Sequence, residues 1–142
     1  MGWLPKDKVV VPIDYSDESL AAVEIARTLV KDCGHLYVVH VLSPMPTNEP
    51  ELLWETDTYE DRIKNCEKAM KERFADVDHQ GIHVHATIGD PGSEIAGYAE
   101  EVGADLICLP SHGRTGLKRL LIGSVAERVC RLAHCPVLVL RD

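Results

Sequence analysis

Five short apolar segments alternate with amphipathic segments along the chain. The apolar segments span residues 8–13, 36–42, 83–88, 106–109 and 136–140, and their lengths and β-branched residues are typical of strands. In the segments between them, apolar residues recur every three or four positions, which predicts helices. This alternation predicts an α/β fold in which the strands form one parallel, doubly wound sheet with helices on both faces.

Capping and turn residues set the expected limits of the helices. The first helix follows a turn at residues 14–17 and is expected to continue to a glycine stop at Cys33-Gly34. The later helices are expected over residues 59–74, 91–102 and 124–132.

The third and fifth strands are expected at the edges of the sheet. Residues 83–88 alternate in polarity, as a half-exposed strand does. Residues 136–140 are continuously apolar and form the last element, which often lies at the edge of a doubly wound sheet. Because an open apolar edge promotes aggregation, we expect the strand Val137–Leu140 to pair with the same strand of a second copy in a homodimer.

The connection after the second strand is unusually long. Pro44, Pro46 and Pro50 interrupt it, and acidic residues are frequent from Glu49 to Asp61. It can serve as a lid over a ligand, as an interaction surface or as a solvated excursion from the sheet.

The composition is that of one globular domain over residues 1–142, because 45% of the residues are hydrophobic and 27% are charged. The net charge of −8 argues against general binding to nucleic acid or to anionic membranes. No apolar run approaches the ~20 residues that cross a bilayer, and the first residues do not resemble a signal peptide, so we expect a cytoplasmic protein. The five cysteines form no Cys-x-x-Cys pair, which indicates free and mostly buried thiols.

Residues 110–126 carry the strongest sign of a binding site. They follow the fourth strand, contain Gly113, Gly116 and Gly123, and lead into a helix at Ser124. Glycines let the main chain approach a ligand, and the N–H groups at a helix start attract anions. Residues 110–135 also carry a net charge of +4 within an acidic chain. The sequence therefore predicts a phosphate site, although the same residues can also form an ordinary turn beside a solvated helix face.

Three other polar groups are candidates for chemistry. Asp14 lies at the carboxyl end of the first strand, where it can form a turn or face a ligand. His83 and His85 point to one side of their strand, but no nearby cysteine or carboxylate completes a set of metal ligands, so no metal is expected. Ser111 and His112 are adjacent but lack the Gly-x-Ser-x-Gly turn of a serine hydrolase, so we expect no catalytic triad.

Four motifs together resemble the universal stress protein family. They are Val-Val-Val-Pro-Ile-Asp-Tyr-Ser at residues 9–16, Val-Val-His-Val at 38–41, Gly-Asp-Pro at 89–91, and Ser-His-Gly at 111–113 followed after nine residues by Gly-Ser. The similarity extends over almost the whole chain. It implies a Rossmann-like fold with five parallel strands in the order 3-2-1-4-5, and dimers that pair through the fifth strand.

In that strand order the sheet reverses between strands one and four, and ligands of such folds bind there at the carboxyl ends. The ATP-binding members of the family carry the pattern Gly-x2-Gly-x9-Gly-Ser/Thr, so the resemblance implies ATP, with or without Mg²⁺, as the ligand. Val41 would contact adenine through its main chain, and Pro12, Asp14 and Ser16 would border the adenosine. The ribose and phosphates would be held by the other candidates, which are Pro110, Ser111, His112, Gly113, Arg114, Gly116, Gly123, Ser124, Val125 and Ala126.

One position departs from the family pattern. Pro110 stands where the pattern has its first glycine, and proline has no N–H to donate. The loss of one hydrogen bond of about 1 kcal/mol, or somewhat more to a charged acceptor, weakens binding roughly tenfold without abolishing it.

The resemblance therefore implies a homodimeric regulatory protein of the stress response that binds ATP or another adenine nucleotide. It would act on a protein partner, which the sequence does not identify. One alternative is a dimeric interaction protein of the same family that has lost the nucleotide, as Pro110 would suggest. The other is a very slow ATPase, for which no residue stands out as a general base.

Overall fold

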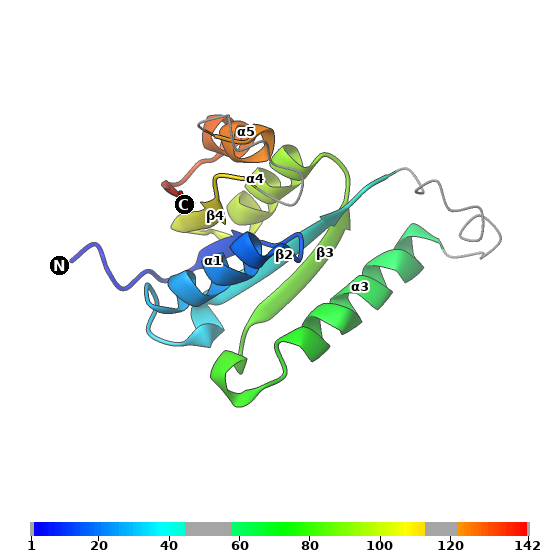
Figure 1. The fold of residues 1–142 in the computed structure, drawn as a ribbon, viewed down its shortest axis with the longest axis horizontal. Coiled ribbons are helices and arrows are strands. Elements are labelled where there is room, and N and C mark those ends of the chain that lie inside the picture. The colour runs from blue at the N-terminus through cyan, green and yellow to red at the C-terminus, as the bar shows by residue number, and fades with distance from the viewer. Residues whose placement is uncertain (1, 45–57, 113–121, 142) are drawn as a thin grey trace.

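The computed structural model describes residues 2–44, 58–112 and 122–141 (Figure 1). The sheet is parallel and its strands follow the order β3-β2-β1-β4-β5. The strands are β1 (Val9–Pro12), β2 (Leu36–Leu42), β3 (His83–Ile88), β4 (Leu106–Pro110) and β5 (Val137–Leu140). The helices are α1 (Asp17–Arg27), α3 (Tyr59–Arg73), α4 (Pro91–Val102) and α5 (Ser124–Leu132), with short 3-10 turns η1 (Cys33–His35) and η2 (Val77–His79). The predicted fold class and strand order are confirmed.

The central strand β1 supplies side chains to both apolar layers of the molecule. Val9 and Val11 point to one face of the sheet, where they belong to the same buried cluster as Met70 of α3. Val10 points to the other face and shares a cluster with Val129 of α5. Because successive strand residues face opposite sides, this continuously apolar strand requires helices on both faces.

The first helix is shorter than the sequence predicts. It ends at Arg27 instead of continuing to the glycine that precedes β2. Thr28 turns the chain, since its hydroxyl and its N–H both donate to the carbonyl of Ile25, at 2.6 and 3.0 Å. The carbonyl of Leu29, the residue after Thr28, accepts a hydrogen bond from the N–H of Lys6 at 2.8 Å. The prediction was wrong because periodicity along the chain does not reveal this pairing with the N-terminal segment.

The β3 edge of the sheet is covered by α3, which runs alongside the strand (Figure 1). Leu42 of β2 accepts a hydrogen bond from the residue after β3, Gly89, so the even-numbered residues of β3 point outward. One of these outward N–H groups, that of Ala86, donates to the Glu67 carboxylate of α3 at 3.1 Å. A side chain from the same molecule therefore occupies this edge.

At the β5 edge of the sheet, unlike the β3 edge, the outward main-chain groups form no hydrogen bond with a side chain of the described residues. The N–H groups of Ile107 and Ser111 donate to the carbonyls of Pro136 and Leu140, at 3.0 and 2.7 Å. Main-chain groups alternate sides along a strand, so the N–H and C=O groups at positions 137 and 139 point away from β4. Within the described part of the chain, nothing pairs with these outward groups.

The long connection after β2 lies largely in residues 45–57, which are outside the described residues. It leads to Thr58, whose hydroxyl accepts a hydrogen bond from the N–H of Asp61 and so caps α3. Over the described ranges, no helix combines the length and apolar character needed to cross a bilayer.

The five cysteines are free thiols, as predicted, but they are less buried than expected. Cys108 is fully buried in β4, and burial raises the pKa of its thiol to about 11. Cys130 is exposed on α5, and the other three are half-buried.

Candidate functional site

The sheet divides at the carboxyl ends of its central strands. β1 pairs with β2 as far as Pro12, but its pairing with β4 stops at Val10 and Ile107. β4 continues to Pro110 while paired with β5. Doubly wound folds bind ligands at this reversal of strand order. We call its surroundings the switch point, defined by residues 12–16, Val41, residues 110–112 and residues 123–126.

The main chain of Val41 faces the switch point from β2. The carbonyl of Val39 accepts a hydrogen bond from the N–H of Ile13 at 2.8 Å, so Val41, two residues later, points to the same side. The Ile13 carbonyl, which would be next in the ladder, instead pairs with Nδ1 of His40 at 2.7 Å. The β1–β2 ladder therefore ends before Val41, whose N–H and C=O are directed beyond β1.

The main chain of Pro110 faces the switch point from β4. The next residue, Ser111, donates its N–H to β5, so Pro110 points in the opposite direction, toward the β1 side. A glycine here would offer an N–H to a ligand, whereas Pro110 offers only its carbonyl. The departure from the family pattern thus affects a group that faces the switch point.

Asp14 starts the turn between β1 and α1. Its Oδ1 accepts a hydrogen bond from the N–H of Ser16 at 3.0 Å, and its own N–H donates to Oγ of Ser19 at 3.2 Å. Ser16 is the N-cap of α1, and its Oγ accepts from the N–H of Ser19 at 3.1 Å. One of the two predicted roles of Asp14, a turn residue, is therefore confirmed, while contact with a ligand stays a prediction.

Tyr15 holds this turn in an unusual conformation. Its φ is 63°, and among the described residues no other non-glycine residue has a positive φ. For a bulky residue this region costs about 1–3 kcal/mol. The half-buried ring packs against the core and meets the His40 ring edge-on, with 5.3 Å between centroids. Burial of the ring offsets the backbone strain.

Gly123 brings the start of α5 against the end of β4. It is the N-cap of α5, and its N–H donates to the carbonyl of Ser111 at 2.6 Å. A Cβ on Gly123 would lie 2.6 Å from that same carbonyl oxygen, so any other residue must displace one of the two segments. In the first turn Ser124 and Val125 are exposed, whereas Ala126 is buried beneath them. The helix start therefore presents N–H groups and a hydroxyl, which favour an anion.

Ser111 and His112 contact each other beside this helix start. Oγ of Ser111 lies 3.1 Å from Nδ1 of His112, and Ser111 is buried. The other ring nitrogen, Nε2, is buried and has no hydrogen-bond partner in the part of the chain that the structure describes. A hydrolase triad would need a carboxylate at that nitrogen, and the described residues supply none.

The predicted site residues that the structure describes all lie in the segments that define the switch point. The other three, Gly113, Arg114 and Gly116, lie outside the described residues. Arg131 pairs with Glu127, which already counts in the net charge of residues 110–135. Arg128 pairs at 2.9 Å with Asp90, which lies outside that segment, so this pair offsets part of its positive charge. The other three basic residues are outside the described ranges.

His83 and His85 are both engaged in ring contacts. His83 stacks on Tyr37 and His85 on Tyr98, each with 4.3 Å between ring centroids. Nε2 of His83 also lies 3.0 Å from the carbonyl of Gly34. Across residues 2–44, 58–112 and 122–141, no group of three acidic, histidine or cysteine side chains is arranged to hold a metal ion.

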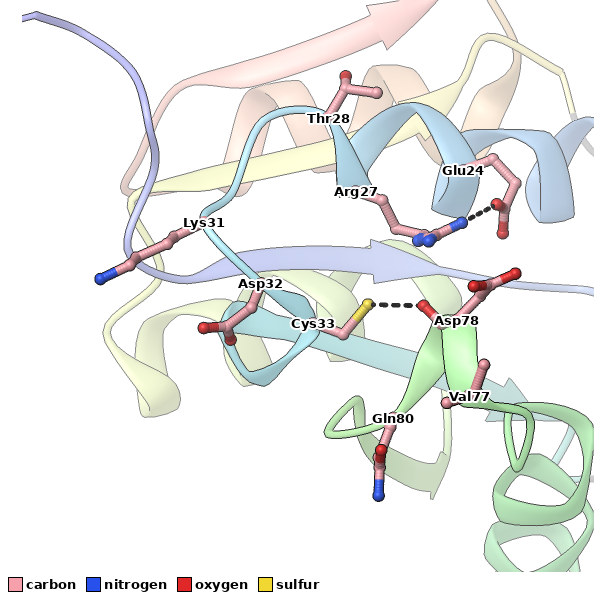
Figure 2. Close-up of a pocket in the computed structure, with 9 residues that line it drawn as sticks. All are labelled: Glu24, Arg27, Thr28, Lys31, Asp32, Cys33, Val77, Asp78 and Gln80. Atoms are coloured by element: carbon pink, nitrogen blue, oxygen red, sulfur yellow. Dashed lines mark hydrogen bonds and ion pairs between the residues drawn. The ribbon is translucent and has the colours of Figure 1, made fainter.

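A second group of polar residues lies around the amino ends of β2 and β3, opposite the switch point. There α1, η1 and η2 border a groove lined by both acidic and basic side chains (Figure 2). The thiol of Cys33 donates to the carbonyl of Asp78 at 3.3 Å, and Arg27 pairs with Glu24 at 2.7 Å. Three acidic side chains, Glu24, Asp32 and Asp78, and two basic ones, Arg27 and Lys31, line the groove, so it carries no large excess of either charge.

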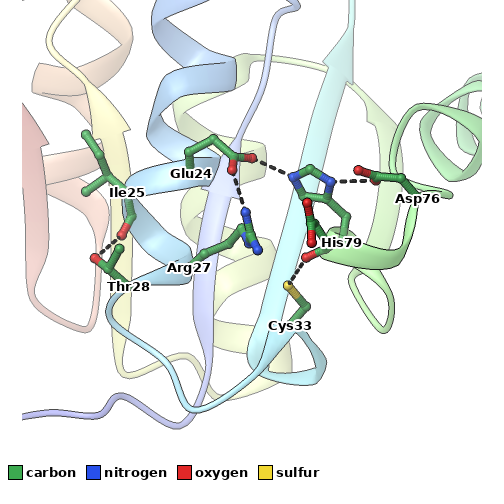
Figure 3. A network of polar contacts seen from close by, with 8 residues as sticks. Glu24, Ile25, Arg27, Thr28, Cys33, Asp76 and His79 are labelled. Carbon is green, nitrogen blue, oxygen red and sulfur yellow. Dashed lines mark hydrogen bonds and ion pairs between the residues drawn. The ribbon is translucent and has the colours of Figure 1, made fainter.

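His79 joins η2 to α1 beside this groove (Figure 3). Its Nε2 lies 2.5 Å from the Glu24 carboxylate and its Nδ1 lies 2.6 Å from the Asp76 carboxylate. Carboxylates only accept, so both nitrogens donate when the ring is positively charged. Burial alone lowers the pKa of His79, but the hydrogen bonds to Glu24 and Asp76 together raise it above its ordinary value.

We expect the free energy of unfolding to fall as pH rises through the folded-state pKa of His79. Because that pKa is raised, the contribution is complete below the unfolded value of about 6.5 and is lost above the folded value. Denaturant titrations between about pH 6 and 9 measure this slope. The Glu24→Gln variant should show a shallower slope, and equal slopes in the two proteins would contradict the assignment.

The chain matches the model of the universal stress protein family over residues 6–141. Universal stress protein MJ0531 of Methanocaldococcus jannaschii is 38% identical over 139 residues, which cover 94% of this chain and 81% of that protein. The solved structure of MJ0577, from the same organism, is 29% identical with a TM-score of 0.72 over 98% of both chains. A universal stress protein crystallised in complex with cAMP is 24% identical, with a TM-score of 0.64 over 96% of this chain and 97% of that chain. This structural similarity shows a shared fold.

Proposed function

The chain belongs to the universal stress protein family, and we propose that it binds an adenine nucleotide, with ATP as the first choice, at the switch point. The observation that carries the proposal is the divergence of the sheet beyond Pro12, where the main chain of Val41 faces β4 and the start of α5 stands close to β4. We further propose that the protein works as a homodimer that regulates a partner, and not as an enzyme.

Val41 suits the adenine base. Its N–H and C=O point to one side, and the edge of adenine likewise presents a donor next to an acceptor. Asp14 and Ser16 lie on the neighbouring turn, where a carboxylate can accept a hydrogen bond from a ribose hydroxyl. Adenosine placed in this way has its phosphates on the side of β4 and α5.

The start of α5 suits the phosphates. Its first turn carries exposed Ser124, and the close contact of Gly123 with Ser111 brings the helix N–H groups to the end of β4. The positive end of the helix dipole stabilises an anion at this position. Mg²⁺, if bound, would contact the phosphates, and its chemistry there is charge neutralisation.

The β5 edge suits a second copy of the chain. α3 covers the β3 edge through Glu67, but the outward main-chain groups of Val137 and Val139 remain available for pairing. Pairing of β5 with its symmetry mate would remove an apolar edge from water. Nucleotide binding must favour one conformation of the dimer to regulate a partner.

Analysis of nucleotide copurified with the natively isolated protein tests the proposal. Adenine nucleotide in near-equal amount to the chain supports it and excludes a member of the family that has lost its ligand. Hydrogen exchange with and without saturating ATP then tests regulation. Unchanged exchange at β5 and in residues 44–61 would contradict a regulatory effect on either surface.

The Pro110→Gly variant is expected to bind ATP more tightly. It restores an N–H that faces the switch point, and one hydrogen bond of about 1 kcal/mol or somewhat more corresponds to up to about tenfold in affinity. Calorimetric titration with MgATP measures the change. The Pro136→Gly variant is the control, because it adds the same backbone freedom at an exposed proline before β5. Equal or weaker binding by Pro110→Gly would show that the missing N–H does not face the ligand.

A further inference from the structure

Tyr15 belongs to the switch point and lies between Asp14 and Ser16, but it is not one of the predicted ligand contacts. Its left-handed backbone makes the sharp turn that lets the Asp14 carboxylate accept from the N–H of Ser16. A change in the backbone conformation at Tyr15 would move the N–H of Ser16 relative to this carboxylate. The geometry of Asp14 therefore depends on the conformation of Tyr15.

The half-buried ring of Tyr15 packs into the apolar core between the sheet and α3. It packs against the same buried cluster as Ile63 and Cys66 of α3. That cluster includes buried Met70 of α3, so the ring of Tyr15 and the inner face of α3 share one apolar core. Burial in this core raises the pKa of the Tyr15 hydroxyl. On the other side the ring meets His40, the neighbour of Val41. Tyr15 thus follows Asp14 in the chain, meets the neighbour of Val41 and shares one core cluster with α3.

The start of α3 is also tied to the end of β2. The hydroxyl of Tyr59 donates to the carbonyl of Pro44 at 2.6 Å, and Arg62 donates to the carbonyl of Ser43 at 2.9 Å. Both acceptors follow closely after Val41. The first turn of α3 is therefore tied to the end of β2 near the switch point, and the inner face of the helix shares a core cluster with Tyr15.

We propose that Tyr15 is a positioning residue that couples the nucleotide site to α3. A ligand held by Asp14 and Val41 favours the left-handed turn, which keeps the ring in the core cluster that it shares with α3. By reciprocity, any partner that restrains α3 strengthens nucleotide binding. The inference rests on the proposed function and adds the contacts through which nucleotide binding would affect α3 at the surface of the molecule.

Hydrogen exchange with and without MgATP tests the coupling in the wild type and in Tyr15→Gly. Glycine adopts the left-handed turn freely, so the variant folds but no longer anchors the turn on α3. In the wild type, ATP should slow exchange at residues 63–70 of α3. In Tyr15→Gly, ATP should bind about tenfold more weakly, because the turn is less preorganised, and the slowing at residues 63–70 should disappear at saturation.

Two further variants separate positioning from a general loss of stability. Tyr15→Phe retains the ring and should restore both the ATP affinity and the α3 response. Ile82→Ala removes apolar contacts from the same cluster at the far end of β3 and should leave both unchanged. ATP binding by the wild type without a response in α3, or a full response in Tyr15→Gly, overturns the coupling but not the proposed function. Absence of ATP binding by the wild type overturns both.

Discussion

Replacement of Gly123 by valine is expected to weaken ATP binding at least about 100-fold, which corresponds to roughly 2.7 kcal/mol. The added Cβ would lie 2.6 Å from the carbonyl oxygen of Ser111, so the start of α5 must move away from β4. This movement breaks the hydrogen bond from Gly123 to Ser111 and displaces the N–H groups that are proposed to hold the phosphates. Titration with MgATP measures the loss.

The control for this variant is Gly97→Val, which adds the same atoms in α4 where a Cβ meets nothing within 4 Å. It should bind ATP as the wild type does. Thermal unfolding of both variants shows whether they fold. A folded Gly123→Val protein with wild-type affinity would place the phosphates elsewhere.

Replacement of Val139 by proline is expected to convert the proposed dimer into a monomer. The N–H at this position points away from β4, so proline removes it without breaking the β4–β5 ladder. The loss of one hydrogen bond from each copy costs about 2 kcal/mol, which weakens the dimer association constant roughly thirtyfold. The steric effect of the proline ring adds to this loss. Sedimentation at several concentrations measures the dissociation constant.

Val139→Thr is the control for the edge strand, because it retains the N–H and the branched side chain. It should remain dimeric. If folded Val139→Pro protein dimerises as tightly as the wild type, the second copy does not pair with the main chain of β5.

The strands and their order could be predicted because each strand is a short apolar run and the connections follow strict topological rules. β2 and β3 have the limits that their patterns indicate. The end of α1 could not be predicted, because the carbonyl of Leu29 accepts a hydrogen bond from Lys6, which is distant in the sequence. The spacing of apolar residues indicates which positions of a segment are buried, but it does not reveal hydrogen bonds to distant segments.

The placement of the candidate residues at one end of the sheet was predictable, whereas their contact with a ligand stays a prediction. The strand order brings Asp14, Val41 and Gly123 to one end of the sheet, as expected from the motifs. The left-handed conformation of Tyr15 carries no sequence signal, because tyrosine rarely adopts it. The contact of His79 with Glu24 was likewise missed, since the two residues are 55 positions apart and meet only in the folded chain.

Calorimetric titration of the nucleotide-stripped wild-type protein with MgATP tests the central claim most directly. A nucleotide site at the switch point predicts binding in the micromolar range with one nucleotide for each chain. No heat of binding, together with no adenine nucleotide in the natively isolated protein, would contradict it. In that case Pro110 would mark a member of the family that acts through its surfaces alone.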